Sequence, residues 1–339
     1  MYSIVTEGLG RRFGDRWAVQ GLTLSVHQGE VFGLLGPNGA GKTTTMRMLA
    51  CLIAPTEGRA LVYGQDVTRD GDNIRRIVGI LSEPAGLYEN LSAQRNLDYY
   101  SKLYDLDYHV AQRRIERFLR MFDLWDRRQE PAGSFSRGMK QKLSLARALL
   151  HEPSVVILDE PTSALDPEGA KLVRDAIRDL KGEGRTIILC THNLNDAQTL
   201  CDRVAIIKKD LLRMGTPREL QASLYGLQVE VRIGNALPEV GDGSRLDTSL
   251  GRTMNDLAEV VTPLPGVGDV AVSSNSLLVS MLDPDETVPE VVRALVGRGA
   301  DITRVAEVEH SLERAYLDLV ARVDERNGTV PTGQLVKVS

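Results

Sequence analysis

The chain has 339 residues, of which 42% are hydrophobic and 26% charged, and its formal net charge is −5. This length predicts two domains, because a single domain usually contains about 100–200 residues. The acidic balance argues against a nucleic-acid partner, which usually needs a concentrated basic face. No apolar stretch approaches the ~20 residues of a membrane-spanning helix, which predicts a soluble globular protein.

The first residues and the cysteines indicate the cytoplasm. The sequence from Met1 to Glu7 lacks the basic and apolar regions of a signal peptide. The three cysteines, Cys51, Cys190 and Cys201, have no metal-binding spacing, and their odd number gives no disulfide framework. We therefore expect a cytoplasmic protein.

The N-terminal part of the chain predicts strands, then a loop and a helix. Residues 3–32 are typical of two or three strands joined by tight turns, which indicates a small β-subdomain. The apolar residues 30–35 predict a further strand, and residues 45–50 predict a helix. Between them lie residues 36–44, with the sequence Gly-Pro-Asn-Gly-Ala-Gly-Lys-Thr-Thr.

Residues 36–44 fit the P-loop pattern G-x-x-x-x-G-K-[ST] at every fixed position. Glycines let backbone N–H groups approach phosphates, and the start of the following helix attracts the same anion. We expect Lys42 to reach the β- and γ-phosphates and the Thr43 hydroxyl to bind Mg²⁺. The alternative is an ordinary glycine-rich turn with a surface lysine, but the strand and helix on either side favour nucleotide binding. The predicted ATP-binding residues of the loop are Gly36, Pro37, Asn38, Gly39, Ala40, Gly41, Lys42, Thr43 and Thr44.

Strands and helices alternate after the loop. Strands are predicted at residues 56–64 and 77–81, and residues 91–150 are rich in helix signals. Two buried strands follow at residues 155–158 and 186–189. Continuous apolar strands that alternate with helices predict an α/β fold with a parallel sheet covered on both faces.

The character of the sequence changes beyond about Pro217. The predicted elements there are strands at residues 228–233 and 277–282, helices at 286–297 and 310–323, a polar loop at 234–253, and a mobile tail from 327.

Two acidic residues, Asp159 and Glu160, directly follow the apolar strand at residues 155–158. This is the Walker B arrangement, in which a buried strand delivers carboxylates to the nucleotide at its C-terminal end. We expect Asp159 to bind Mg²⁺ and Glu160 to act as general base toward the attacking water. A strand that simply ends in solvated acids is the alternative, and the P-loop upstream makes it the weaker one.

These motifs together resemble the ATP-binding cassette (ABC) family over residues 1 to about 220. The stretch Phe135-Ser136-Arg137-Gly138-Met139-Lys140-Gln141 is similar to the family's signature, usually written LSGGQ. Phe135 replaces the Leu, Arg137 the first Gly and Met139 the Gln. Ser136 and Gly138 match, and a hydroxyl with bare N–H groups at a helix start suits a γ-phosphate. Taken alone, Ser136 would be an ordinary helix N-cap.

The resemblance also implies roles for residues 161–167 and for His192. Residues 161–167 are similar to the family's D-loop, which couples two protomers. His192 follows the strand at residues 186–190, where the family places a switch histidine that contacts the γ-phosphate. A lone histidine at a strand end is more often structural, but this one follows the strand at the expected place.

Two positions depart from the family pattern or leave a choice. The family usually has Gln where this chain has Glu83, whose carboxylate can still bind Mg²⁺ or its water. Phe13 stands at the place of the aromatic residue that stacks on adenine, and a phenyl ring stacks without hydrogen bonds. The alternatives are that Phe13 packs in the core and that Trp17 stacks on the base.

The resemblance implies a head-to-tail pair with a second copy or a paralogous cassette, and with two Mg-ATP between the protomers. The P-loop of one protomer would then face Ser136 and Gly138 of the other. Separate integral-membrane permease subunits would dock near Glu83, Pro84, Leu87 and Tyr88, which places the protein at the cytoplasmic face of a membrane. Residues 87–92, the signature variant and residues 309–317 resemble drug- and sodium-export cassettes that pair with ABC-2-type permeases.

The predicted fold class is therefore a P-loop NTPase (RecA-like) ABC cassette with a β-subdomain and a helical subdomain, followed by a small α+β domain. Its predicted boundaries are 1–220 for the ATP-binding domain, about 86–150 for the helical subdomain, 221–326 for the accessory or regulatory domain and 327–339 for the tail.

Three other functions compete with an ATP-hydrolysing export subunit. A soluble ABC ATPase acting on ribosomes or DNA usually carries two cassettes or a long coiled-coil insertion, and this chain shows neither. A P-loop kinase or GTPase would not need Ser136-Arg137-Gly138 or His192. A scaffold that binds ATP without cleaving it is disfavoured because Glu160 and His192 are both present.

Overall fold

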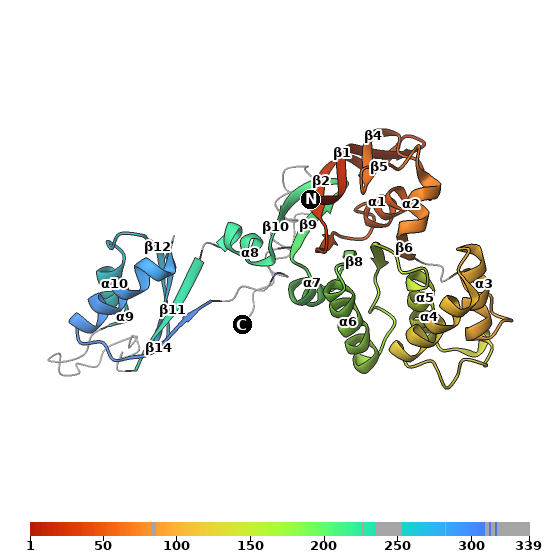
Figure 1. The fold of residues 1–339 in the computed structure, drawn as a ribbon. Coiled ribbons are helices and arrows are strands. Elements are labelled where there is room, and N and C mark those ends of the chain that lie inside the picture. The colour runs from red at the N-terminus through yellow and green to blue at the C-terminus, as the bar shows by residue number, and fades with distance from the viewer. Residues whose placement is uncertain are drawn as a thin grey trace. The chain divides into compact units, whose positions relative to one another are not determined.

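The computed structural model describes residues 1–82, 86–225, 227–234, 253–281 and 283–308, together with Leu312 and Tyr316. The chain forms two compact units, of which the first extends to Pro217 and the second begins at Arg218 (Figure 1). Most of the loop predicted at 234–253 and of the helix predicted at 310–323, and the whole tail from 327, lie outside the described residues.

The first unit opens with an antiparallel sheet of order β2-β1-β4-β5. On β2, Leu22, Leu24 and Val26 are buried and alternate with exposed or half-buried residues, because successive side chains of a strand point to opposite faces. This alternation gives the sheet one apolar face, as the sequence predicts for a β-subdomain. The strands are β1 (Tyr2–Phe13), β2 (Arg16–His27), β4 (Glu57–Val62) and β5 (Gln65–Asp66).

A second sheet of six strands, in the order β10-β9-β3-β8-β7-β6, forms the centre of this unit. Its strands are β3 (Val31–Leu35), β6 (Val78–Leu81), β7 (Val155–Asp159), β8 (Thr186–Thr191), β9 (Arg203–Lys208) and β10 (Asp210–Gly215). All pair in parallel except β10, which runs antiparallel to β9. Every residue of β3 and β8 is buried, so both faces of the sheet are covered and the predicted parallel sheet is confirmed.

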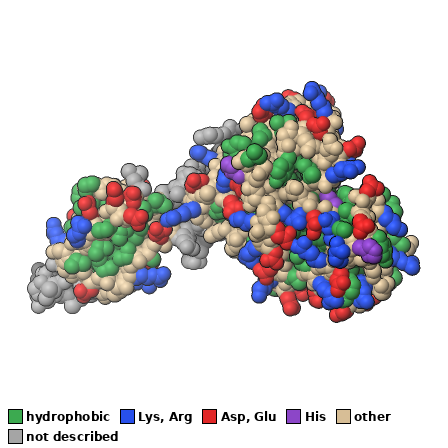
Figure 2. Space-filling view, in the orientation of Figure 1, with side chains coloured by type: hydrophobic (Ala, Val, Ile, Leu, Met, Phe, Trp, Pro, Cys, Tyr) green, Lys and Arg blue, Asp and Glu red, His purple; other side chains and the backbone are tan. Residues whose placement is uncertain are grey.

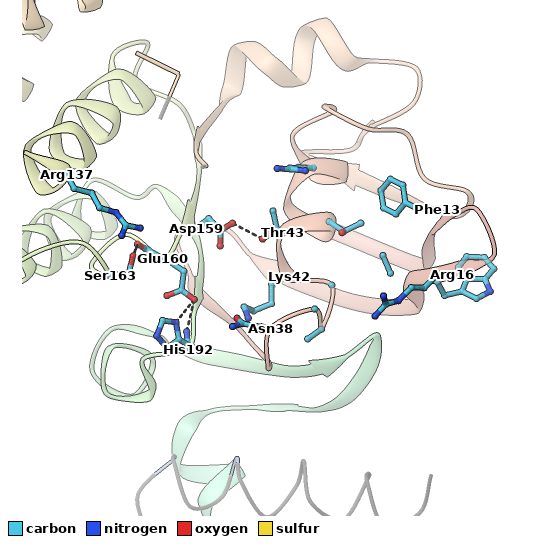
Figure 3. A pocket seen from close by; sticks show the side chains of 17 residues that line it. Phe13, Arg16, Asn38, Lys42, Thr43, Arg137, Asp159, Glu160, Ser163 and His192 are labelled. Carbon is cyan, nitrogen blue, oxygen red and sulfur yellow. Dashed lines mark hydrogen bonds and ion pairs between the residues drawn. The ribbon is translucent and has the colours of Figure 1, made fainter. Parts of the chain in front are cut away.

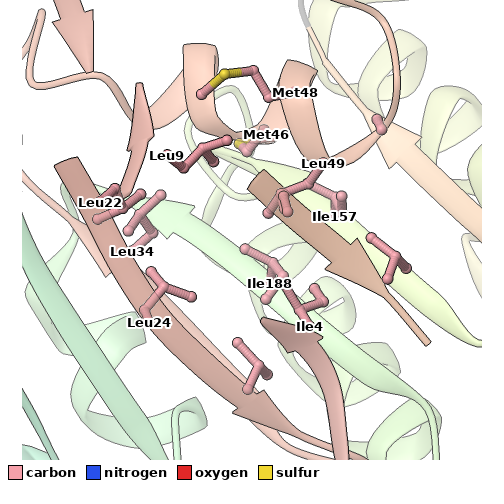
Figure 4. Close-up of a cluster of buried hydrophobic side chains, with 14 of the residues drawn as sticks. Ile4, Leu9, Leu22, Leu24, Leu34, Met46, Met48, Leu49, Ile157 and Ile188 are labelled. Carbon is pink, nitrogen blue, oxygen red and sulfur yellow. The ribbon is translucent and has the colours of Figure 1, made fainter. Parts of the chain in front are cut away.

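The main core lies between the two sheets. Figure 4 shows Ile4 and Leu22 of the antiparallel sheet facing Leu34, Ile157 and Ile188 of the central sheet. Helix α1 (Lys42–Leu49) closes the same core with Met46, Met48 and Leu49. Since α1 starts directly after the P-loop, burial of its apolar side fixes the loop against the central sheet.

Other helices complete the first unit. Helices α6 (Pro167–Gly182) and α7 (Leu194–Leu200) lie on the side of the central sheet away from β1 and β2 (Figure 1). Helix α2 (Gly71–Ile77) leads into β6. The strand predicted at 77–81 is therefore one residue too long, because Ile77 closes the last turn of α2 and extended backbone begins at Val78.

The segment between β6 and β7 is helical, as predicted. Ser92 caps α3 by accepting from the Arg95 N–H, and Asp107 caps α4 in the same way, so both helices start at polar side chains. The elements are α3 (Ala93–Leu103), α4 (Tyr108–Met121), a 3₁₀ turn η1 (Ala132–Ser134) and α5 (Arg137–Leu149).

The described residues of the second unit form strands and helices around their own core. Its elements are β11 (Leu227–Ile233), α9 (Met254–Val261), β12 (Val267–Ser273), β13 (Ser276–Met281), α10 (Pro284–Gly297) and β14 (Ile302–Glu307), preceded by α8 (Pro217–Tyr225). The strands form an antiparallel sheet of order β12-β13-β11-β14. The predictions of β11, β13 and α10 are confirmed, whereas α9, β12 and β14 were not predicted.

Within the part of the chain that the structure describes, no helix has the length and apolar character needed to cross a membrane.

Candidate functional site

The site forms where parallel strands of the central sheet end. Leu158 of β7 pairs with Leu189 of β8, and Asp159 with Cys190, so the last residues of both strands meet at one edge. The N–H of Glu160 donates to the carbonyl of Cys190 over 2.8 Å, which extends the pairing one residue beyond β7. Burial raises the pKa of the Cys190 thiol well above its usual range, so a neutral group lies behind these carboxylates.

The P-loop connects β3 to α1 along the same edge. Gly41 has a φ of 102°, and a Cβ there would lie 2.6 Å from the Ala18 carbonyl oxygen, so only glycine fits. The Lys42 amine donates to the carbonyl of Gly36 over 2.6 Å and to that of Pro37 over 3.3 Å. The loop thus wraps around the amine, as a phosphate-binding lysine requires.

Thr43 and Asp159 meet across the site. The Thr43 hydroxyl donates to Asp159 Oδ2 over 2.8 Å, although the residues are 116 positions apart in sequence. A hydroxyl beside a carboxylate is an oxygen donor pair that suits Mg²⁺. No cluster of three or more His, Cys, Asp or Glu side chains able to hold a metal ion occurs among the described residues. A Mg²⁺ ion carried by a nucleotide needs no such cluster, because phosphates and water supply most of its ligands.

Glu160 and His192 form a pair at the ends of β7 and β8. Nδ1 of His192 lies 2.8 Å from Glu160 Oε1, and the His192 backbone N–H donates to the same oxygen over 3.0 Å. The Thr191 hydroxyl approaches Oε2 at 3.4 Å. The carboxylate is therefore fixed mainly through Oε1, which leaves Oε2 as the freer oxygen.

These groups line one open pocket of about 700 Å³ (Figure 3). Four cationic side chains and two carboxylates face it, so its formal charge is positive, as a polyphosphate ligand requires. Gly36 and Pro37 are not among the lining residues and contribute through their carbonyls to Lys42. The lining residues are Phe13, Arg16, Trp17, Ala18, Asn38, Gly39, Ala40, Gly41, Lys42, Thr43, Thr44, Arg47, Arg137, Asp159, Glu160, Ser163 and His192.

Phe13 lies at the opposite end of this pocket from Glu160 (Figure 3). Its side chain is 51% exposed, so the alternative that it packs in the core is wrong. The guanidinium carbon of Arg11 lies 4.8 Å from the ring centroid. Trp17 also lines the pocket, so both aromatic candidates for stacking on a base remain.

The signature residues Ser136 and Gly138 lie outside the pocket that the P-loop and Walker B residues line. Ser136 is the N-cap of α5 and accepts from the Met139 N–H over 3.2 Å. Neither Ser136 nor Gly138 lines the pocket of its own chain, and their action on a partner's nucleotide stays a prediction. Glu83 lies outside the described residues.

Sequence reasoning missed several side chains of the pocket. Arg16 lies beside the predicted aromatic residues, and Arg47 stands one helical turn after Thr43, a spacing that could have signalled it. Ser163 donates its hydroxyl to the carbonyl of Glu160 over 3.0 Å. Arg137 was identified only as a departure from a pattern.

A phosphate-binding loop between a central parallel strand and a helix, with carboxylates at the end of a neighbouring strand, defines a P-loop nucleoside triphosphatase. The profile of the ABC transporter family matches residues 19–163. The chain is also 37% identical over 320 residues to the daunorubicin resistance ATP-binding protein DrrA3 of Streptomyces coeruleorubidus, covering 94% of this chain and 95% of the relative.

Other ATP-binding proteins and solved structures are also similar to this chain. A Nod factor export ATP-binding protein I of Ralstonia nicotianae is 35% identical, covering 68% of this chain and 73% of that protein. A solved ATP-binding subunit of an ABC transporter superposes with a TM-score of 0.61 at 30% identity, over 65% of this chain and 92% of the other. A dimeric ATP-binding cassette bound to ADP and Pi shares the fold, with a TM-score of 0.58 at 24% identity over 63% of this chain and 98% of the other.

The chain belongs to the ATP-binding proteins of ABC transporters. It is an ABC-type ATPase, the ATP-binding subunit of a transporter.

Proposed function

We propose that two copies of this chain, or this chain and a paralogue, close around two Mg-ATP and part after hydrolysis. The observation that carries this proposal is the incomplete site. P-loop, Walker B and His192 groups share one pocket, whereas Ser136 and Gly138 of the same chain do not line it. A second cassette would supply these two groups, and the γ-phosphate would link the protomers.

Within each site, different residues would bind the phosphates, the Mg²⁺ ion and the base. Lys42 and the N–H groups of residues 38–44 would bind the β- and γ-phosphates. Thr43 and Asp159 would hold Mg²⁺, which when bound neutralises charge on the phosphates. Phe13 would stack on the base at the far end of the pocket.

Hydrolysis requires a base at the γ-phosphate end. A water attacks the γ-phosphorus, its proton passes to Glu160, and ADP leaves with the electrons of the broken P–O bond. Oε2 of Glu160 is the oxygen that would accept the proton, because Oε1 already binds His192 through two contacts. Nε2 of His192, the ring nitrogen that does not contact Glu160, would contact the γ-phosphate and so sense its presence.

Replacing Glu160 tests this function. Glu160→Gln keeps the shape and removes the base, so ATP turnover should fall by about 100-fold or more while ATP binding persists. Sedimentation should then show a nucleotide-dependent dimer. Glu168→Gln, an exposed residue in the first turn of α6 and outside the pocket, is the matched control. Turnover within twofold of wild type in Glu160→Gln would exclude this residue as the base.

We further propose that the motion passes to separate membrane permease subunits, which would bring the protein to the cytoplasmic face of the membrane. Tyr88 is 46% and Tyr99 40% exposed, and their ring centroids lie 4.8 Å apart. An exposed aromatic pair, formed by Tyr99 of α3 and by Tyr88 ahead of that helix, suits a protein partner better than water. Co-purification with a membrane protein, lost in a Tyr88→Ala/Tyr99→Ala double variant that still binds ATP, would support this contact.

Residues 1–220 are proposed as the ATP-binding domain and 221–326 as an accessory or regulatory domain. Two observations support the division: the second compact unit begins at Arg218, and its buried residues form a separate cluster. On the face shown in Figure 2, acidic and basic side chains are intermixed over the first unit, which gives no support to a ribosome- or DNA-bound ATPase.

A further inference from the structure

The start of helix α5 is attached directly to the segment that follows β7. The Gln141 side chain donates to the carbonyl of Glu160 over 3.2 Å. A Cβ on Gly138 would lie 3.2 Å from the Ala164 carbonyl oxygen, so the two backbones are closely packed there. The first turn of α5 therefore has a fixed position relative to the base of its own chain.

Arg137 is the first residue of α5 and stands four positions before Gln141. Residues four apart lie on the same side of a helix, so Arg137 and Gln141 share the side that faces Glu160. Consecutive helical residues point about 100° apart, which allows Arg137 to face this pocket while its neighbours Ser136 and Gly138 face elsewhere. The structure agrees, because Arg137 lines the pocket and they do not.

The surroundings of Arg137 are those of a phosphate ligand. It lines the pocket with Asp159, Glu160 and Ser163, at the end opposite Phe13 (Figure 3). The two carboxylates attract its guanidinium to this end of the pocket. A guanidinium presents five donors in a rigid fork that matches phosphate oxygens. The signature pattern has a glycine at this position, which brings no side chain.

We propose that Arg137 binds the γ-phosphate of the nucleotide in its own chain. This inference rests on the proposed ATP site. It adds to the residues that a partner would contribute one residue, Arg137, that acts on the nucleotide of its own chain. ADP lacks the γ-phosphate, so Arg137 makes the single chain prefer triphosphate over diphosphate before any dimer forms. The carboxylates keep the guanidinium at this end of the pocket until the phosphate competes for it.

The experiment compares triphosphate and diphosphate binding by the single chain. Full-length protein is titrated with a non-hydrolysable ATP analogue and with ADP, each with Mg²⁺, at concentrations where sedimentation shows a monomer. Arg137→Ala removes the guanidinium, and Arg137→Lys keeps a charge without the fork. Lys140→Ala is the matched control, because it removes one positive charge from the same helix at a residue outside the pocket that pairs with Glu89.

Arg137→Ala should weaken triphosphate binding by about tenfold and leave ADP binding within twofold, since a charge-assisted hydrogen bond to phosphate is lost. Arg137→Lys should fall between wild type and Arg137→Ala, and Lys140→Ala should match wild type. Equal effects of Arg137→Ala on both nucleotides, or none on the monomer, would overturn the proposal. Lys42→Ala separates the two hypotheses: if it leaves both nucleotides bound normally, the ATP site itself is wrong.

Discussion

Glu160 has a φ of 49°, in the left-handed region that residues other than glycine rarely adopt. Such a conformation costs of order 1–3 kcal/mol and persists only where the surroundings enforce it. Here the backbone bond to Cys190 and the two contacts of Oε1 with His192 enforce it. Strain at this one residue turns the carboxylate from the line of β7 into the pocket, which fits its proposed role as base.

Phe13 allows a test of base recognition at the same scale. Phe13→Ala should weaken ATP binding by about tenfold, because stacking of a base on an aromatic ring contributes roughly 1–3 kcal/mol. GTP should lose the same factor, since a phenyl ring offers no hydrogen bond that distinguishes the bases. Nucleotide titrations with ATP and GTP would measure both effects.

Trp17→Ala is the matched control for that experiment, because Trp17 lines the same pocket. The prediction places the base on Phe13, so Trp17→Ala should change affinity less than Phe13→Ala. The reverse order would assign stacking to Trp17. Thermal unfolding should be nearly unchanged in Phe13→Ala, as its ring is 51% exposed.

At the scale of elements, the central sheet was predictable and much of the second unit was not. Strands β3, β7 and β8 are short apolar runs that end in recognisable motifs, and burial on both faces makes such runs continuous. By contrast, β12 and β14 are edge strands with mostly exposed residues, so no apolar pattern marks them. Helix α9 has eight residues, and its one clear signal is the capping box of Thr253 and Asp256.

The candidate site likewise contains residues that the sequence predicted and residues that it did not. The P-loop and Walker B motifs are short continuous stretches of sequence, so they can be recognised without knowledge of the fold. The sequence alone therefore located Lys42, Thr43, Asp159 and Glu160. Arg16, Arg47 and Arg137 come from a strand, a helix face and another helix start, and only the fold brings them to one pocket. Their roles follow from position rather than from any motif.

The junction of α5 and β7 gives a prediction about pH. His151 stacks on Tyr104 with ring centroids 4.0 Å apart, and its Nε2 lies 3.2 Å from the Val78 carbonyl oxygen. Its buried Nδ1 has no hydrogen-bond partner among the residues that the structure describes. Burial, with the nearby Arg114 and Arg185, lowers the pKa of His151 to about 4. In the unfolded chain the pKa of His151 is near 6.5, so below neutral pH the unfolded chain binds a proton at this residue more readily than the folded chain does.

The stabilising contribution of His151 is complete above pH ~6.5 and is lost as the pH falls toward 4. Between pH 7.5 and pH 5 the loss should be about 2 kcal/mol in the free energy of unfolding. Urea unfolding at both values would measure it. His151→Gln keeps a donor toward Val78 without titrating, so its stability should drop less over the same range. An equal drop in both proteins would assign the pH dependence to other groups.

At the scale of the whole molecule, the described residues of the two units bury their apolar side chains in separate clusters. The cluster that contains Ile4, Met46 and Ile188 shares no residue with the one that contains Val229 and Leu277. Every residue that lines the pocket belongs to the first unit. A chain with independent cores is expected to unfold in more than one step, and its nucleotide chemistry should not require the second unit.

A chain shortened to end at Tyr225, the last residue of α8, tests this independence. The fragment should fold and bind ATP within about twofold of the full chain, because the apolar contacts that fix the P-loop lie within the first unit. Calorimetry should resolve one transition for the fragment and two for the full chain, the second disappearing with the truncation. Lys42→Ala in the fragment is the control for specific binding. Loss of ATP binding in a folded fragment would show that the accessory unit shapes the pocket, and would change its proposed role from regulatory to structural.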